Sequence, residues 1–247
     1  MGRAARLIPL QSEWYTDAMK QTGVNQMNGE NMEALYREAK DRYDHRANED
    51  DVAAAEAMFR ELGDYADAPA YVEKCETLKR FAVGRTVEFG AGLRWRVVDL
   101  RGRMRLLLAE RDVAHRAYDD RLRDTSWAEC SLRKWLNHVF LEEAFTPQER
   151  TRIVSGVVRN RRSPKFFTNG GANTVDKVFI PDMEEILRYL PAEADRAGDG
   201  WWWLRTPGCN LLSAASVYTD GSIYDIGIHV NYPAGGVRPM LWVLLRV

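Results

Sequence analysis

The segment Trp201-Trp202-Trp203-Leu204-Arg205-Thr206-Pro207-Gly208 decides the fold, because it places three consecutive indoles in one short run. Burying an indole removes a large apolar area from water. We therefore expect at least two of these tryptophans to fill a core beneath the loops that follow. Arg205, together with Arg238, is expected to brace those loops through bidentate bonds to carboxylates or carbonyls.

The next segment, residues 209–232, predicts a hairpin that turns at Asp220-Gly221. Strand alternation places Ala215, Val217 and Ile223 on one side, and Ser216, Tyr218 and Tyr224 on the other, exposed side. Exposed tyrosines give a large contact area at low entropic cost, and short polar residues give adaptable hydrogen bonds. The residues of this segment that we expect to bind a ligand are Cys209, Asn210, Leu211, Leu212, Ser213, Ser216, Tyr218, Tyr224, Asp225, Ile226, Ile228, His229, Asn231 and Tyr232.

Glycines in and after this hairpin are assigned to the scaffold. Gly227 and Gly235-Gly236 are expected to supply backbone angles that other residues resist.

Residues 1–82 read as a helical segment. Helices are expected to begin at Asn31, at Asp50 or Asp51, and near Asp67, each with apolar residues at helical spacing. The second and third resemble one tetratricopeptide-type helical hairpin. One hairpin is too little for a solenoid, so we interpret it as a docking or spacer element.

From residue 83 the apolar period changes from that of a helix toward that of a strand. Asp182 with Glu185, and Thr146 with Glu149, form capping boxes that predict helix starts. A helix is also expected after Ser131, with a buried stripe that includes Val139. Strand-like segments occupy residues 86–89, 93–98, 104–108, 153–158, 178–180 and 241–245. Helices early and strands late predict an α+β fold, with residues 83–247 as the second domain.

The composition excludes several classes of protein. Lys and Arg number 35 against 36 Asp and Glu, a net charge of −1, so no basic field is present to hold nucleic acid. No apolar run is long enough to insert in a membrane, and residues 1–9 show no secretory signal. A virion-associated and a cytoplasmic location both stay open, as does the oligomeric state.

No catalytic, metal or cofactor site is expected from motifs. The three cysteines form no CxxC pair, and the four histidines are scattered. Sequence signatures of nucleophile elbows, phosphate loops and zinc proteases are absent. The basic run 159–162 is interpreted as part of an exposed loop.

The pattern from residue 83 to the end of the chain resembles a domain frequent in gut bacteria and their phages, related to the C-type-lectin and formylglycine-generating-enzyme folds. The motifs that carry the resemblance are Ser131-Leu132-Arg133-Lys134-Trp135-Leu136-Asn137, Ala144-Phe145-Thr146, Val178-Phe179-Ile180-Pro181, Trp202-Trp203-Leu204-Arg205-Thr206-Pro207-Gly208 and Gly236-Val237-Arg238-Pro239. Some members of this group are variable proteins of diversity-generating retroelements. The resemblance implies a C-type-lectin-like domain whose variable region, residues 209–234, binds a macromolecular ligand, expected to be a protein.

In such proteins, the resemblance implies, a reverse transcriptase rewrites adenines, so that AAC codons become any NNC codon. NNC codons cannot encode Met, Trp, Lys, Glu or Gln. Residues 207–238 contain none of the five, although they make up roughly a fifth of the chain. Such a gap would arise by chance in roughly a few cases per thousand.

Two alternatives stay open. A modifying enzyme of the formylglycine-generating type would need reactive cysteines close together, and Cys130 and Cys209 are the candidates. A family member with fixed loops would instead serve as a structural module of a phage or cell surface. Calcium-dependent sugar binding is not expected, because the segment shows no carboxylate cluster.

Overall fold

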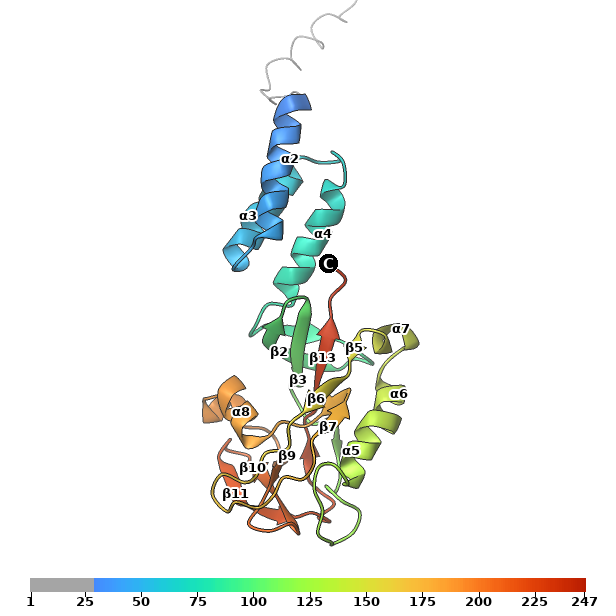
Figure 1. The fold of residues 1–247 in the computed structure, drawn as a ribbon, viewed down its shortest axis with the longest axis vertical. Coiled ribbons are helices and arrows are strands. Elements are labelled where there is room, and N and C mark those ends of the chain that lie inside the picture. Colours follow the sequence, from blue (N-terminus) through green and yellow to red (C-terminus); the bar gives the residue numbers. More distant parts are fainter. Residues whose placement is uncertain (1–28) are drawn as a thin grey trace, which may run out of the picture. The chain divides into compact units, whose positions relative to one another are not determined.

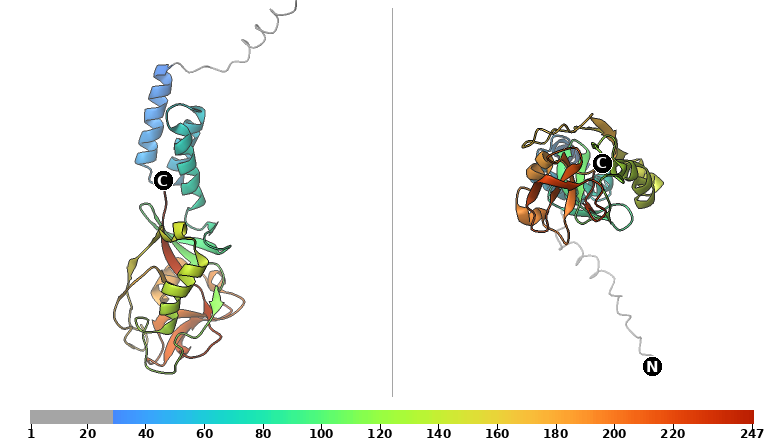
Figure 2. Two further views of the ribbon diagram at one scale, coloured as in Figure 1. Left: turned by 90° about the vertical axis from the view of Figure 1, so that its right-hand side faces the viewer. Right: turned by 90° about the horizontal axis from the view of Figure 1, so that it is seen from below.

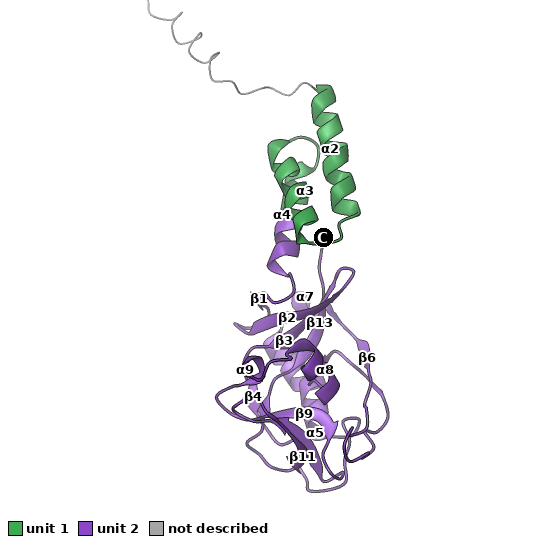
Figure 3. Cartoon of the chain, turned by 90° about the vertical axis from the view of Figure 1, so that its left-hand side faces the viewer, with its two compact units in different colours: residues 1–72 green, residues 73–247 purple. Residues whose placement is uncertain are grey.

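The computed structural model describes residues 29–247, whose helices and strands are drawn in Figure 1. Residues 1–28, which the sequence assigns to the helical segment and for which it predicts no secretory signal, lie outside the described residues. The chain contains both helices and strands, and helices come first, so the α+β class and the N-terminal helical segment are confirmed. Two compact units divide between Val72 and Glu73 (Figure 3).

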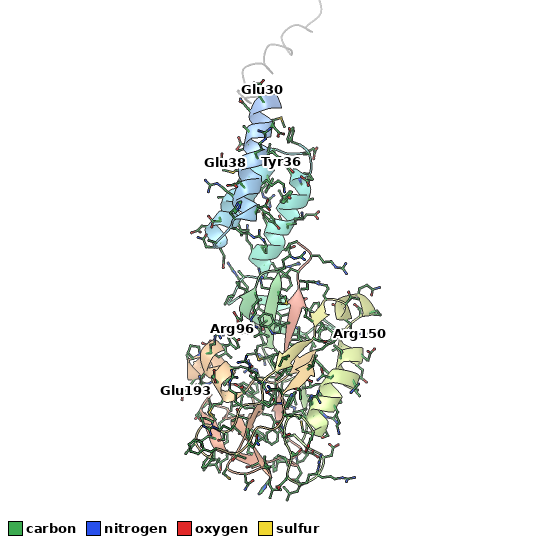
Figure 4. All side chains as sticks on the ribbon, viewed as in Figure 1. Glu30, Tyr36, Glu38, Arg96, Arg150 and Glu193 are labelled. Carbon is green, nitrogen blue, oxygen red and sulfur yellow. The ribbon has the colours of Figure 1, made fainter. Side chains whose placement is uncertain are left out.

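The first unit is helical. It contains α2 (Gly29–Asp44), α3 (Glu49–Glu61) and the start of α4 (Ala68–Arg80). The buried ring of Phe59 stacks on Tyr71 with centroids 4.7 Å apart and meets Tyr36, labelled in Figure 4, edge-on at 6.2 Å. These aromatic contacts give the unit its core.

The predicted cap of α3 is wrong by two or three residues. Asn48 caps the helix: its side chain accepts from the Asp51 amide at 3.0 Å, and the Asp51 carboxylate accepts from the Asn48 amide at 3.2 Å. Asp51 is therefore the reciprocal partner in a capping box and not the cap itself.

The second unit carries the strands, which form three sheets. One sheet has the order β1-β2-β3-β13-β5, with β8 also paired to β13; a second has the order β11-β10-β9-β12-β4; the third is the pair β6-β7. The strands are β1 (Thr86–Glu88), β2 (Arg94–Arg101), β3 (Met104–Ala109), β4 (Ala114–His115), β5 (Ile153–Val154), β6 (Gly156–Val158), β7 (Thr174–Asp176), β8 (Val178–Phe179), β9 (Trp202–Pro207), β10 (Ser213–Val217), β11 (Ile223–His229), β12 (Gly236–Val237) and β13 (Met240–Leu244).

The strand predicted over residues 153–158 is two strands. β5 pairs with β13, whereas β6 pairs with β7, so the chain changes sheet at Ser155. The periodicity could not reveal this break, because both strands are apolar and short.

Helices flank the strands on two sides, with α5 to α6 on one and α8 on the other (Figures 1 and 2). The helical elements of this unit are α5 (Ser131–Trp135), the π-helical segment η1 (Leu136–Phe140), α6 (Leu141–Ala144), α7 (Pro147–Arg150), α8 (Met183–Tyr189) and α9 (Glu193–Arg196). The capping boxes predicted at Thr146 and Asp182 are both present and begin α7 and α8.

The π-helical segment corrects one predicted core position. Val139 is 44% exposed, although α-helical spacing places it on the buried stripe. A π-helix bonds i to i+5 and so turns more slowly than an α-helix, which rotates the following residues away from the expected face. Asn137 of this segment accepts from the Val178 amide at 3.1 Å and donates to the Val178 carbonyl at 2.8 Å, which ties η1 to β8.

Strand β9 lies at the centre of the five-stranded sheet and is buried along its whole length. Trp202 and Trp203 are both fully buried, as predicted for at least two of the three tryptophans. Each indole N–H reaches a carbonyl outside the strand: Trp202 donates to Arg196 at 3.1 Å and Trp203 to Arg116 at 2.8 Å. Two connecting segments are therefore fixed to this strand.

Arg205 of β9 braces the surrounding loops, as predicted. Its side chain is 1% exposed, and its Nη2 lies 3.2 Å from Asp182 Oδ2 and 3.1 Å from Glu185 Oε2. The guanidinium also donates to the carbonyls of Ile180 and Arg159. Burial raises the pKa of Glu185, and the Arg205 charge opposes that rise. Arg205 thus compensates the half-buried Glu185 carboxylate and, together with Arg161 at 2.7 Å, the buried Asp182 carboxylate, whose burial would otherwise be costly.

We predict that Arg205→Met lowers the free energy of unfolding by about 3 kcal/mol. The change leaves half-buried Glu185 without this cation, leaves Asp182 with Arg161 at 2.7 Å, and removes a buried donor from the carbonyls of Ile180 and Arg159. Arg188→Met is the control: that side chain is 68% exposed at 4.0 Å from Asp99, and such pairs contribute about 0–1 kcal/mol. Denaturant unfolding followed by tryptophan fluorescence measures both. Equal losses for the two variants would contradict the role of Arg205.

Candidate functional site

The predicted ligand-binding residues lie on strand β10, in the β10–β11 turn, on edge strand β11, and on the loops before and after this hairpin (Figure 1). Twelve of the fourteen are exposed or half-buried. The exposed residues are Cys209, Asn210, Tyr218, Ile226, His229, Asn231 and Tyr232, and the half-buried ones are Leu211, Leu212, Tyr224, Asp225 and Ile228.

The loop over residues 209–212 is bonded to β11 through its backbone. The Cys209 amide donates to the Ile226 carbonyl at 2.8 Å, and the Val230 amide donates to the Leu212 carbonyl at 2.9 Å. The side chain of Asn210 accepts from the Leu212 amide at 3.0 Å and so holds the loop turned. These bonds bring the predicted residues of the loop and of β11 side by side.

At the turn, Tyr218 stacks on Tyr224 with ring centroids 5.0 Å apart and planes at 21°. The turn itself is the one predicted, since the Tyr218 amide donates to Ser222 and Gly221 has a φ of +86°. Burial, with Tyr224 as a smaller cause, raises the pKa of Tyr218. Tyr218 is therefore a neutral hydrogen-bonding group near pH 7.

At the other end of β11, Tyr232 is supported by the tryptophan run. Its ring lies 5.9 Å from that of Trp201, which packs edge-on against buried Trp203 at 4.8 Å. The adjacent Val230 carbonyl accepts from the amide of Asp119 at 2.8 Å. Tyr232 is thus 51% exposed but rests on a fixed base.

A residue that the sequence interpretation missed contacts this site. Lys165 lies 2.9 Å from Asp225 Oδ2, which ties the loop over residues 159–174 to β11. The next exposed residue, Phe167, is 65% exposed at a φ of +59°, with the Arg162 guanidinium 5.0 Å from its ring centre. The sequence gives only the signal of a basic loop, because Lys165 and Asp225 are 60 residues apart.

The prediction that Ser213 and Ser216 are exposed is wrong. Ser213 is 6% exposed and Ser216 is 0% exposed. Strand β10 pairs with β9 on one side and with β11 on the other, and it is buried on both faces. Ile223, placed on the buried side by alternation, is half-buried. A bulge between Ala214 and Ser216 also interrupts the alternation that the prediction assumed. Both serines belong to the frame beneath the site.

The glycines behave in two ways. Gly227 has a φ of +90°, as predicted. Gly235 and Gly236 have no such angle; a Cβ atom at Gly235 would clash with the Trp203 indole, and one at Gly236 with the Asp112 carboxylate. They are required for close packing and not for backbone angle.

No metal centre is evident in this part of the chain: residues 29–247 hold no group of three or more His, Cys, Asp and Glu side chains placed to bind one. Cys130 is buried and caps α5, accepting from the Arg133 amide at 3.4 Å, and burial raises its pKa to about 12. Cys209 is exposed. Over the same residues, no helix combines the length and the apolar character needed to cross a membrane.

We predict that Ile226→Ser changes the free energy of unfolding by less than about 0.5 kcal/mol, because the side chain is 45% exposed. The neighbouring change Gly227→Ala should cost about 1–3 kcal/mol, since the new Cβ would lie 2.8 Å from the Ala214 carbonyl oxygen at an unfavourable φ. Urea unfolding of the two variants measures this. A loss at Ile226 as large as that at Gly227 would assign Ile226 to the core.

We predict that Ser216→Ala leaves stability unchanged or raises it by up to about 1 kcal/mol, because its buried hydroxyl has no hydrogen-bond partner among the described residues. Ser213→Ala should lose about 0.5–1.5 kcal/mol, since that hydroxyl donates to the carbonyls of Asn210 and Ile226. Thermal unfolding of both variants compares them. Destabilisation by Ser216→Ala would indicate a polar role that the contacts do not show.

Comparison with known proteins gives one match. The family model "Domain of unknown function (DUF6273)" matches residues 104–245, which is more than half of the chain and includes the whole candidate site. No curated protein and no solved structure matches the chain. The chain belongs to the DUF6273 family.

Proposed function

We propose that this chain is a ligand-binding protein and not an enzyme, and that its second unit is a C-type-lectin-like domain. The exposed and half-buried residues of β11 and its loops would contact a macromolecular ligand, which we propose to be a protein. The observation that carries the proposal is the contrast between these solvent-facing side chains and the fully buried Trp202 and Trp203 beneath them.

The residue types of the site suit protein recognition. Tyr218, Tyr224 and Tyr232 each bring a ring with a polar end, and such residues provide much contact area for little lost side-chain entropy. The backbone that carries them is bonded at both ends of β11. A platform fixed in this way avoids part of the ordering cost of association.

We further propose that a retroelement diversifies these positions. The support is compositional: residues 207–238 lack all five amino acids that NNC codons cannot encode. The exposed Ile226 adds to this, because selection for solubility alone would disfavour a large apolar side chain there. Random codon replacement on a stable frame accounts for both features.

The environments of the cysteines support the modifying-enzyme alternative less well than they support a ligand-binding protein. Thiolate chemistry requires a lowered pKa in an accessible site, whereas Cys130 is fully buried with its pKa raised to about 12. Its sulfur is engaged as a helix cap. A structural module with fixed loops is the remaining alternative, and it differs from our proposal in whether the site varies.

We predict that the gene, sequenced across a population, varies at adenine-derived positions of codons 209–234 and that substitutions gather at the twelve solvent-facing positions. Ser213 and Ser216 should stay small, because the buried strand has no room for larger side chains. A template copy and a reverse-transcriptase gene should lie nearby. The codons for β9, which encode core residues, serve as the control and should not vary.

An invariant segment with neither a template copy nor a reverse-transcriptase gene would overturn diversification and favour the fixed module. Variation that fell equally on the β9 codons would show that the frame is not conserved and would also contradict the proposal.

A further inference from the structure

A polar pocket of about 600 Å³ lies at the opposite edge of the five-stranded sheet from the candidate site. Its lining residues lie between β3 and β4, on β4, in the segment after α9, at the start of β9 and directly after β12. Strand β10 lies between β11 and β9, whose Trp202 lines the pocket. Its volume lies within the range of small-molecule sites, roughly 300–1,000 Å³. Nothing in the proposed function uses it.

Asp112 is the unusual residue of this pocket. Its side chain is 15% exposed, and the contact shown for its carboxylate is His115 Nε2 at 3.5 Å. Within residues 29–247 it accepts no hydrogen bond. The carboxylate also packs against the backbone of Gly236, where no Cβ atom would fit. A largely buried carboxylate thus faces the pocket with unused acceptor capacity.

The other charged groups of the wall are already engaged. Glu110 lies 3.1 Å from Arg94 Nε, and Asp199 lies 2.9 Å from Arg111 Nη1. Arg238 donates to the carbonyls of Ala109 at 3.0 Å and Arg196 at 3.3 Å. Among the carboxylates that line the pocket, that of Asp112 is therefore the one available to pair with a ligand.

The ion pairs around the pocket indicate the sign of that partner. Of its three carboxylates, Glu110 is paired with Arg94 and Asp199 with Arg111, whereas Asp112 has no lysine or arginine of the described residues within 4.0 Å. Burial raises the pKa of Asp112, and the lowering effects of His115 and Arg238 do not cancel that rise. The ionised carboxylate lacks enough positive charge around it, and a cation in the pocket would supply it.

We infer that this pocket binds a small molecule carrying a primary amino group, with the ammonium ion paired to the Asp112 carboxylate. An ammonium offers three N–H donors as well as a charge, which matches a buried carboxylate that has none. A hydroxyl group of a ligand could donate a hydrogen bond to the Asp112 carboxylate but could not neutralise its negative charge. A carboxylate ligand would be repelled by the Asp112 carboxylate.

The test compares three probes of equal chain length at pH 7.5: n-butylamine, n-butanol and butyrate. In nitrogen-15 NMR titrations of the full chain, n-butylamine should shift the amides of Val113, Gly200 and Gly236 saturably, whereas n-butanol and butyrate should not. Asp112→Asn should weaken n-butylamine binding at least tenfold. Its melting temperature should equal or exceed that of the unchanged protein, because a buried charge with poor compensation is removed. Glu143→Gln, on exposed α6, is the matched control and should keep the affinity.

A second variant tests the space without altering the charge. A Cβ atom at Gly200 would lie 3.9 Å from both Asp112 Oδ2 and His115 Nε2, an ordinary contact at an unstrained φ. Gly200→Leu should therefore fold, occupy the part of the pocket beside Asp112 and abolish saturable binding of the amine. The inference is overturned if n-butanol or butyrate binds as well as n-butylamine, if Asp112→Asn keeps the affinity, or if Gly200→Leu still binds the amine.

Discussion

Burial of two neighbouring indoles on one central strand is the constraint on which the second unit depends. Successive residues of a strand point to opposite faces, so Trp202 and Trp203 enter the core on both sides of the five-stranded sheet. Each indole N–H must find an acceptor in that interior. The acceptors are the carbonyls of Arg196, the last residue of α9, and Arg116, which directly follows β4. Packing the strand therefore fixes the end of a helix and a loop as well as the sheet.

Buried arginines extend this constraint to segments that have little regular structure. Arg205 holds Asp182 and Glu185 at the start of α8, and Arg196 donates to the carbonyl of Gly221 in the hairpin turn at 2.9 Å. Arg238 stacks over Trp202 at 4.7 Å while it donates to two carbonyls. A planar guanidinium can satisfy several carbonyls at once. The loops around the candidate site are thus held by the core beneath them.

Local features could be predicted from the sequence, and features that depend on pairing could not. The capping boxes at Thr146 and Asp182, the turn at Asp220-Gly221 and the burial of the indoles each depend on neighbouring residues or on size. For the site, alternation placed Tyr218 outward correctly but failed at Ser216, because burial of β10 depends on strands that pair with it from both sides. The ion pair of Lys165 with Asp225 joins distant segments, and no local pattern marks it.

The two edges of the five-stranded sheet can act independently. The candidate site centres on β11, and the pocket proposed to bind an amine lies by β4, with Trp202 of central strand β9 in its lining. Arg196 is shared: its guanidinium holds the hairpin turn, and its carbonyl accepts from Trp202 and Arg238. Coupling between sites requires an element with two discrete arrangements. A buried arginine whose Nε and Nη1 donate to the carbonyls of Gly221, Leu190 and Pro191 is held in a single arrangement. Replacement of side chains on β11 should therefore leave the pocket unchanged, which is the independence that the proposed variable surface and the proposed amine pocket require of the sheet.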